Sequence, residues 1–265
     1  MSNFKKVIDF NKSFGLPHFD EEQFNILGEN INLSNLRVDL CIEEIEELKE
    51  AFKTNNFIEV IDALTDELYV IYGAASSFGI NIDNMISRFT KNSSNESNYN
   101  KLLNYNGKKI REFTCNLGYK KHLKTNNILE NLLKDDKGNQ FNKFLEKLSN
   151  LVDSLKKFQK EKNFKEVKET LHNLLYYTYI CGILLNIDLD KSFEIVHNSN
   201  MSKLCSNEQE AKDTVEWYKI NDNRYDSPNY RLSYNNQYWV VFNESTGKIL
   251  KNKNYTPANF EIMLK

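Results

Sequence analysis

The sequence predicts a mainly α-helical protein: a duplicated four-helix-type bundle with a small antiparallel β-sheet at its C-terminus. Three observations support this prediction. Apolar residues recur at helical spacing over long stretches, and the 265 residues include only 3 prolines and 9 glycines to interrupt them. A pattern in the first half returns about a hundred residues later. After about residue 206 the pattern changes to short segments rich in Tyr and Asn.

Composition and charge exclude several classes of protein. Apolar residues make up 40% of the chain, which is enough for a large core. The net charge of -2 argues against a nucleic-acid-binding protein, because such proteins usually carry a basic excess. No apolar run reaches the roughly 18 residues that a membrane span needs, and the first residues show no apolar signal segment. We therefore expect neither nucleic acid nor membrane as a partner.

The cysteines are widely spaced and form no CxxC pair: Cys41, Cys115, Cys181 and Cys205. Such spacing is typical of reduced thiols in an intracellular protein. We therefore expect a cytoplasmic, reducing location.

Helical spacing predicts a series of helices in the first half. The first ends at Gly15 and the third stops at Gly79, because glycine commonly follows the last helical residue. A loop over residues 16–32 separates the first two, and Ser34 is expected to cap the second. The polar run 91–98 is the best candidate for a linker. The predicted helices cover about residues 3–14, about 34–53, 57–78, and a segment that begins at Asp83.

The second half repeats the first. The segment Asn56–Val60 (NFIEV) returns as Asn163–Val167 (NFKEV), an offset of 107 residues from Phe57 to Phe164. A weaker copy of the first helix stands at residues 108–113. An ungapped register through two helices and a loop indicates internal duplication, and two copies would pack as a pseudo-dimer within one chain. A homodimer of whole chains is a further option. The same offset pairs Tyr69 with Tyr176, Tyr72 with Tyr179, Ile80 with Ile187, and Asp83 with Asp190.

These patterns divide the chain into three predicted parts. Residues 1–98 form the first helical repeat, which retains the acidic residues, and residues 99–206 form a second, degenerate repeat. Residues 207–265 add a short helix at about 208–218 and a small sheet packed on the bundle. The strands of this sheet are expected at residues 230–234, 238–242 and 248–251.

Acidic residues cluster on the second and third predicted helices. Three of them share a face of the second helix, since residues three or four apart are neighbours there. The others form a stripe on the third helix, beside its apolar stripe. Such a set repels itself unless a cation neutralises it, and Mg²⁺ prefers oxygen ligands while leaving room for water and phosphates. The residues are Glu43, Glu44 and Glu47 on the second helix, and Glu59, Asp62 and Asp66 on the third.

The alternative is a solvated helix face, which Glu-rich helices commonly form. Two observations count against it. Asp62 and Asp66 lie in the middle of a helix, where Asp is mildly unfavourable. The second copy has also lost most of the acids, and a generic solvated face would have no reason to be acidic in one copy only. The replacements are Asn150 for Glu43, Leu151 for Glu44, Ser154 for Glu47 and Asn173 for Asp66.

The motif EExxE at residues 43–47, followed by Asp62-Ala-Leu-Thr-Asp66-Glu-Leu-Tyr69, resembles the all-α nucleoside triphosphate pyrophosphohydrolases. This superfamily includes MazG-like enzymes, dimeric dUTPases and phosphoribosyl-ATP pyrophosphohydrolases. Its hallmark is EExxE on one helix and ExxD on the next, which together bind Mg²⁺. Here Glu59 and Asp62 match ExxD literally, whereas the family's D-[LIV]-x-Y context fits Asp66 better. The ligand on this helix is therefore Glu59, Asp62 or Asp66, with the two aspartates favoured.

A second segment strengthens the resemblance. Residues 196–204 (VHNSNMSKL) resemble the HxSNMSK segment of the MazG-like subgroup, and residues 247–251 (GKILK) resemble its tail. By resemblance, Asn200 and Lys203 contact substrate. Because one half has kept the acids and the other this segment, we infer one composite active site per chain.

The resemblance implies hydrolysis of a nucleoside triphosphate between its α and β phosphates, in nucleotide-pool housekeeping. It implies Mg²⁺, with Mn²⁺ as an alternative ion, held by Glu44, Glu47, Asp62 and Asp66. Glu43 or Glu44 would orient and deprotonate the attacking water. Two alternatives stay open: a non-catalytic nucleotide-binding or interaction protein on the same fold, and a phosphoribosyl-ATP pyrophosphohydrolase.

Three further residues have two interpretations each. His197 is either a general acid or a hydrogen-bonding residue at a helix end. Tyr69 either stacks on a nucleobase or belongs to the core. Arg37 either reaches a phosphate or pairs with Glu44 or Glu59.

Overall fold

The computed structural model describes residues 1–83, 136–185 and 187–263. Several sequence-based predictions therefore lie outside the described residues. They are the body of the helix expected from Asp83, the linker at 91–98, the copy of the first helix at 108–113, and Cys115.

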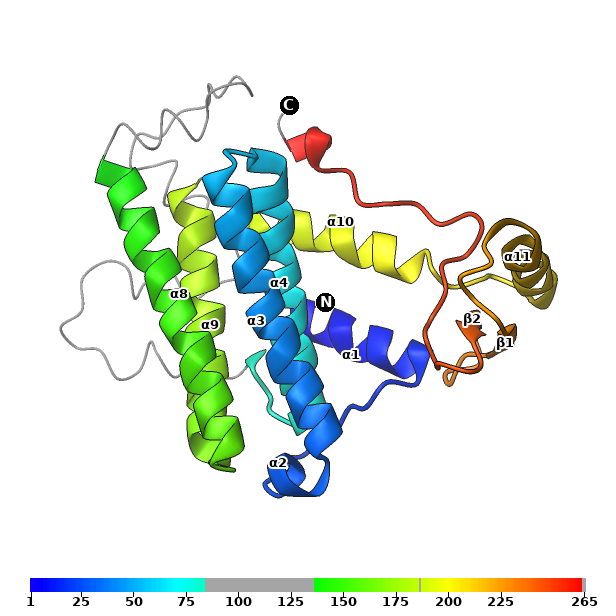
Figure 1. Ribbon diagram of the computed structural model, residues 1–265, viewed down its shortest axis with the longest axis horizontal. Helices are drawn as coiled ribbons and strands as arrows, with labels where there is room; N and C mark the ends of the chain where they lie inside the picture. The colour runs from blue at the N-terminus through cyan, green and yellow to red at the C-terminus, as the bar shows by residue number, and fades with distance from the viewer. Residues whose placement is uncertain (84–135, 186, 264–265) are drawn as a thin grey trace.

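Four long helices form the bundle that the sequence predicted (Figure 1). Helix α3 pairs with α4 and α8 pairs with α9, while α3 also packs on α8 and α4 on α9. Leucines at the centre of all four helices are completely buried, so one continuous core joins the two helix pairs. The helices are α3 (Ile31–Lys53), α4 (Phe57–Phe78), α8 (Asp136–Lys160) and α9 (Phe164–Leu184).

Two further helices cover α4 on the side away from α8. They are α1 (Asn3–Phe14) and α10 (Leu189–Met201), and both contact α4 and each other (Figure 1). A single helical turn, α2 (Ile26–Glu29), precedes α3. Because α10 crosses α4, residues near the end of α10 reach the acidic stripe of the first half.

Local signals explain most helix ends. The predicted bounds of α1 and α4 are confirmed: Gly15 (φ 69°) and Gly79 (φ 71°) end them in the left-handed conformation that glycine adopts without strain. The predicted start of α3 is wrong. Its cap is Asn30, whose Oδ1 accepts from the backbone N of Leu33 at 3.1 Å. Ser34 lies inside the helix, fully buried, and donates to the carbonyl of Ile31 at 3.1 Å.

The α3–α4 and α8–α9 hairpins share their turn geometry at the predicted offset of 107 residues. Asn55 (φ 57°) and Lys162 (φ 55°) are both left-handed. The next residue caps the following helix in each hairpin: Asn56 accepts from the backbone N of Glu59 at 3.3 Å, as Asn163 does from Glu166 at 3.3 Å. Equivalent sequence positions therefore adopt equivalent conformations at these turns.

The C-terminal part contains α11 (Glu208–Asn221) and two antiparallel strands, β1 (Pro228–Leu232) and β2 (Trp239–Asn243). The third strand expected at 248–251 is reduced to one bridge, between Phe242 and Ile249. The chain leaves the sheet there because the buried side chain of Asn252 donates to the carbonyl of Leu204 at 2.9 Å. The last described residues form the short helix η3 (Phe260–Met263), which contacts α4 and α10.

Two observations concern the expected environment. The three cysteines among the described residues, Cys41, Cys181 and Cys205, are buried free thiols, as the sequence predicted. Among the described helices, none combines the length and the apolar character that crossing a membrane requires.

Candidate active site

The acidic residues singled out in the sequence lie on neighbouring parts of α3 and α4. Those nearest the helix contact are half-buried, and the others are exposed at its rim. This arrangement places carboxylates from two helices at the edge of the core. The half-buried residues are Glu44, Asp62 and Asp66, and the exposed ones are Glu43, Glu47 and Glu59.

Burial and mutual repulsion raise the pKa values of the half-buried carboxylates. Burial, followed by the charges of neighbouring acids on both helices, raises the pKa of Glu44 to about 8. Burial and the charges of Asp62 and Glu47 raise the pKa of Asp66 to about 7, against the opposing charge of Lys203. Burial and the charges of Glu59 and Glu47 raise the pKa of Asp62 to about 6. The six residues thus form one electrostatic cluster, called the acidic cluster below.

The donor set of the acidic cluster suits a hard divalent cation. All its donors are carboxylate oxygens, as Mg²⁺ and Mn²⁺ prefer. The Oε2 atom of Glu44 is buried without a hydrogen-bond partner in the described structure, so a cation would satisfy it. Within the described ranges, however, no three His, Cys, Asp or Glu side chains already form a metal-binding group. The fit to Mg²⁺ therefore rests on the carboxylate donors and the unpartnered Oε2 atom of Glu44, and not on a preformed cage.

A chain of hydrogen bonds connects the end of α10 with α4. Lys203 Nζ donates to Asn200 Oδ1 at 2.6 Å, and the Asn200 side chain also bonds the Tyr69 hydroxyl. Since the amide oxygen accepts from Lys203, the amide nitrogen is the group that donates to Tyr69. The Tyr69 hydroxyl also forms a hydrogen bond with His197 Nδ1, 3.3 Å away. Burial and the charge of Lys6 lower the pKa of His197, which favours the neutral ring.

The structure therefore brings together predicted residues from both halves of the chain. The charge of Asp66 on α4 acts on Lys203, which follows α10. Asn200, Lys203, Tyr69 and His197 form one network beside the acidic cluster. His197 takes part in a hydrogen bond there, and its role as a general acid stays a prediction.

The ring of Tyr69 belongs to the core. It stacks on Phe193, with centroids 5.2 Å apart at 16°, and meets the edge of Phe10 at 5.6 Å and 87°. These aromatic contacts favour the core interpretation of the ring over nucleobase stacking. The hydroxyl group is the part of Tyr69 that reaches the network.

Arg37 lies apart from the acidic cluster. It is 9% exposed, and its Nε donates to Ser77 Oγ at 2.8 Å. The guanidinium group of Arg37 also lies against Gly73, where an added Cβ atom would be 3.2 Å from Nη1. Ion pairs with Glu44 or Glu59, which are described residues, do not form. The physical reason is that helical side chains lean toward the helix N-terminus, so Arg37 leans away from acids that follow it.

The sequence interpretation missed Glu67. This residue is fully buried, and neither carboxyl oxygen has a hydrogen-bond partner in the described structure. Burial, with the charge of Glu44, raises its pKa well above the usual range. It lies near the buried thiols of Cys41 and Cys181, whose pKa values its charge raises further. Two signals could have identified it: its helical spacing from Leu64 and Ile71, both core residues, and a leucine at the equivalent position of the second hairpin.

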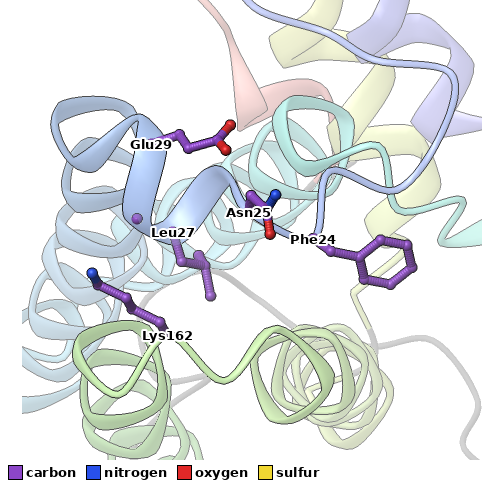
Figure 2. Close-up of a pocket in the computed structure, with 6 residues that line it drawn as sticks. Phe24, Asn25, Leu27, Glu29 and Lys162 are labelled. Carbon is purple, nitrogen blue, oxygen red and sulfur yellow. The ribbon is translucent and has the colours of Figure 1, made fainter.

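A pocket elsewhere holds none of the predicted residues. Figure 2 shows it where α2 faces the turn between α8 and α9, and its lining includes Phe24, Leu27, Glu29 and Lys162. Phe24 packs edge-on against Phe164, with centroids 5.1 Å apart. The pocket is therefore separate from the acidic cluster in composition and in place.

Comparisons with known proteins relate the chain to a family. A family model described as phosphoribosyl-ATP pyrophosphohydrolase matches residues 7–93, which include all six acids. An uncharacterized protein of Acanthamoeba polyphaga mimivirus is 35% identical over 265 residues, covering 99% of this chain and 96% of that protein. No solved structure matches the chain. The network residues Asn200 and Lys203 lie outside the family match.

Proposed function

Because this chain belongs to the all-α nucleoside triphosphate pyrophosphohydrolase superfamily, a group of hydrolases, we propose that it is a Mg²⁺-dependent nucleoside triphosphate pyrophosphohydrolase. The reaction converts a (deoxy)nucleoside triphosphate and water into the monophosphate and diphosphate. One observation carries the proposal: carboxylates of α3 and α4 form a single electrostatic cluster that faces Lys203. Burial and the charges of neighbouring acids raise the pKa values of Glu44, Asp62 and Asp66, which a fully solvated helix face would not do.

The proposed roles follow from position. Mg²⁺, when bound, supplies positive charge that neutralises the phosphate chain and the leaving diphosphate. Glu44, Glu47, Asp62 and Asp66 would hold it, with Glu59 at the rim. Glu43 or Glu44 would orient water and accept its proton as the water oxygen bonds to the α-phosphorus. The bond from that phosphorus to the bridging oxygen breaks, and the electron pair leaves with diphosphate.

Residues of the second half complete the proposed site. Lys203 would neutralise charge that develops on the phosphates, and Asn200 would hold Lys203 in place through their 2.6 Å hydrogen bond. The proposal thus keeps one composite site per chain, with the repeats at residues 1–98 and 99–206 as a pseudo-dimer. The matching turns at Asn55 and Lys162 support this duplication.

A second candidate is a phosphoribosyl-ATP pyrophosphohydrolase, which the matched family description favours. The HxSNMSK resemblance favours the MazG-like side. Both candidates cleave between the α and β phosphates, so they differ in substrate and not in chemistry.

A substrate panel tests the proposal. Canonical and modified nucleoside triphosphates and phosphoribosyl-ATP would be incubated with the full chain in Mg²⁺, Mn²⁺ or EDTA, and diphosphate and phosphate would be measured separately. We expect diphosphate from at least one triphosphate, and none in EDTA. Cleavage of phosphoribosyl-ATP alone would select the second candidate. Nucleotide binding without any turnover would replace both with a non-catalytic nucleotide-binding protein.

A further inference from the structure

The segment after β2 returns to the bundle and packs on the end of α10. Figure 1 shows it running from the small sheet along α10 to η3. Ser199 Oγ donates to the hydroxyl of Tyr255 at 2.9 Å, and the backbone N of Thr256 donates to Ser202 Oγ at 3.0 Å. This C-terminal tail, residues 250–263, therefore lies directly on the segment that contains Asn200 and Lys203.

Lys251 is the first charged residue of the tail. Its backbone N donates to the hydroxyl of Tyr218 at 3.1 Å. Its ammonium group lies over the ring of Tyr255, 4.4 Å from the centroid. Because Tyr255 is itself bonded to Ser199, these contacts direct the Lys251 side chain toward the end of α10. The charge of Lys251 acts on Lys203 there and, after burial, helps to lower its pKa.

Neither of these two ammonium groups forms a salt bridge with another described residue. Lys253, two positions further on, does so with Asp213 at 2.9 Å. Lys203 instead donates to the neutral oxygen of Asn200, and Asp66 provides the opposing charge that acts on it. Two like charges held close together cost free energy unless an anion joins them. Beside a cluster of carboxylates suited to Mg²⁺, a polyphosphate is an anion that could bind the metal and both lysines at once.

We propose that Lys251 is a substrate-binding residue, which together with Lys203 binds phosphate oxygens of the nucleotide's polyphosphate chain. This inference rests on the proposed function and extends it. In this proposal, the C-terminal tail supplies a residue to the substrate-binding site in addition to packing on the bundle.

Binding of inorganic pyrophosphate tests the inference without requiring turnover. Titration calorimetry on the full chain would compare wild type with Lys251→Gln, Lys251→Arg and Lys203→Gln. The matched control is Lys248→Gln, because Lys248 is also exposed and also lies over a ring, that of Tyr225 at 5.5 Å. We expect Lys251→Gln to raise Kd about tenfold, since it removes one charge-assisted contact. Lys251→Arg should stay within about threefold of wild type, because it keeps the charge, and Lys248→Gln should match wild type.

The outcomes separate the inference from the proposed function. An unchanged Kd in Lys251→Gln, or an equal loss in Lys251→Arg, would overturn the inference, since the residue would then only dock the tail. Absence of pyrophosphate binding to wild type would also overturn it. Pyrophosphate binding that depends on Lys251, in a protein that cleaves no triphosphate, would instead overturn the proposed function and leave the binding site in place. With an active substrate, we expect Lys251→Gln to raise KM more than it lowers kcat.

Discussion

The hydroxyl oxygens of Tyr72 and Tyr179 lie 3.2 Å apart, and the two residues are separated by 107 positions in the sequence. This separation equals the offset of the predicted repeat. When two copies pack around a two-fold axis, residues on the axis contact their own counterparts. Asp83 and Asp190, which are separated by the same offset, bond different partners: Asp83 accepts from Ser2 at 2.5 Å, and Asp190 accepts from Asn3 at 2.9 Å. The contact between the two tyrosines supports the predicted pseudo-dimer, in which the acidic cluster would occupy one of two equivalent places.

Replacing Glu47 by Gln should abolish diphosphate release while leaving the fold intact. Glu47 is exposed, and its charge acts on Glu44, Asp62 and Asp66, so it is central to any cation site. We expect kcat/KM to fall about 100-fold or more, with an unchanged far-UV circular dichroism spectrum. Glu46→Gln is the control, because Glu46 is exposed on the same helix but pairs with Lys49 at 2.6 Å. Retained activity in Glu47→Gln would refute the metal-binding assignment.

The metal-free protein should lose stability as the pH rises from about 5.5 to about 8.5. The pKa values of Asp66 and Glu44 are about 7 and about 8, above the roughly 4 of an unfolded carboxyl. The native state therefore holds more protons in this range, and its stabilisation disappears as they leave. Thermal unfolding in EDTA should give a lower Tm at the higher pH. Excess Mg²⁺ should raise Tm mainly at the higher pH, and a Tm independent of both variables would contradict the electrostatic account.

Tyr69→Phe should impair catalysis without disturbing the core. The substitution keeps the ring on Phe193 and removes the hydroxyl that joins Asn200 to His197. We expect kcat/KM to fall about tenfold and Tm to change little. Tyr72→Phe is the matched control, because its hydroxyl bonds Tyr179 and not the network. Equal effects of the two substitutions would show that Tyr69 acts only through packing.

Glu67→Leu should stabilise the protein. Glu67 is fully buried without a hydrogen-bond partner in the described structure, and the equivalent residue of the second hairpin is Leu174, also fully buried. An apolar residue of similar volume removes the cost of burying the acid, so we expect a gain of about 1–3 kcal/mol in the free energy of unfolding. Urea denaturation of the metal-free protein measures it, with Glu67→Gln as the polar comparison. A destabilised Glu67→Leu protein would mean that an unobserved partner satisfies the carboxyl group.

Much of the helical framework could be predicted from the sequence because its signals are local. Gly15 and Gly79 end α1 and α4 where glycine's freedom at positive φ predicts. The start of α3 could not be predicted in this way, since Asn30 and Ser34 are both good caps by composition. The choice depends on tertiary packing, which buries Ser34 completely. The third strand was lost for a similar reason, because the Asn252 contact that ends it is distant in the sequence.

The site was predictable where helical spacing alone fixes which side chains are neighbours. Spacing places Glu44 beside Glu47 and Asp62 beside Asp66 whatever surrounds them. It does not give the direction of a long side chain, so the predicted pairing of Arg37 with Glu44 or Glu59 was wrong. Its contact with a phosphate stays a prediction. Nor does helical spacing show which surface the C-terminal tail packs on. The proposed role of Lys251 therefore depends on the contacts that join the tail to α10.

Each of the two hairpins described above contains one residue that is unfavourable at its position. Lys162 holds a left-handed conformation that costs roughly 1 kcal/mol for a residue with a long side chain, whereas Asn55 adopts it more easily at the equivalent place. The first hairpin in turn has an acid in its core where the second has leucine. Each half therefore contains, at the equivalent position, the residue expected to stabilise the other half. For protein engineering, comparing the two halves position by position suggests stabilising substitutions.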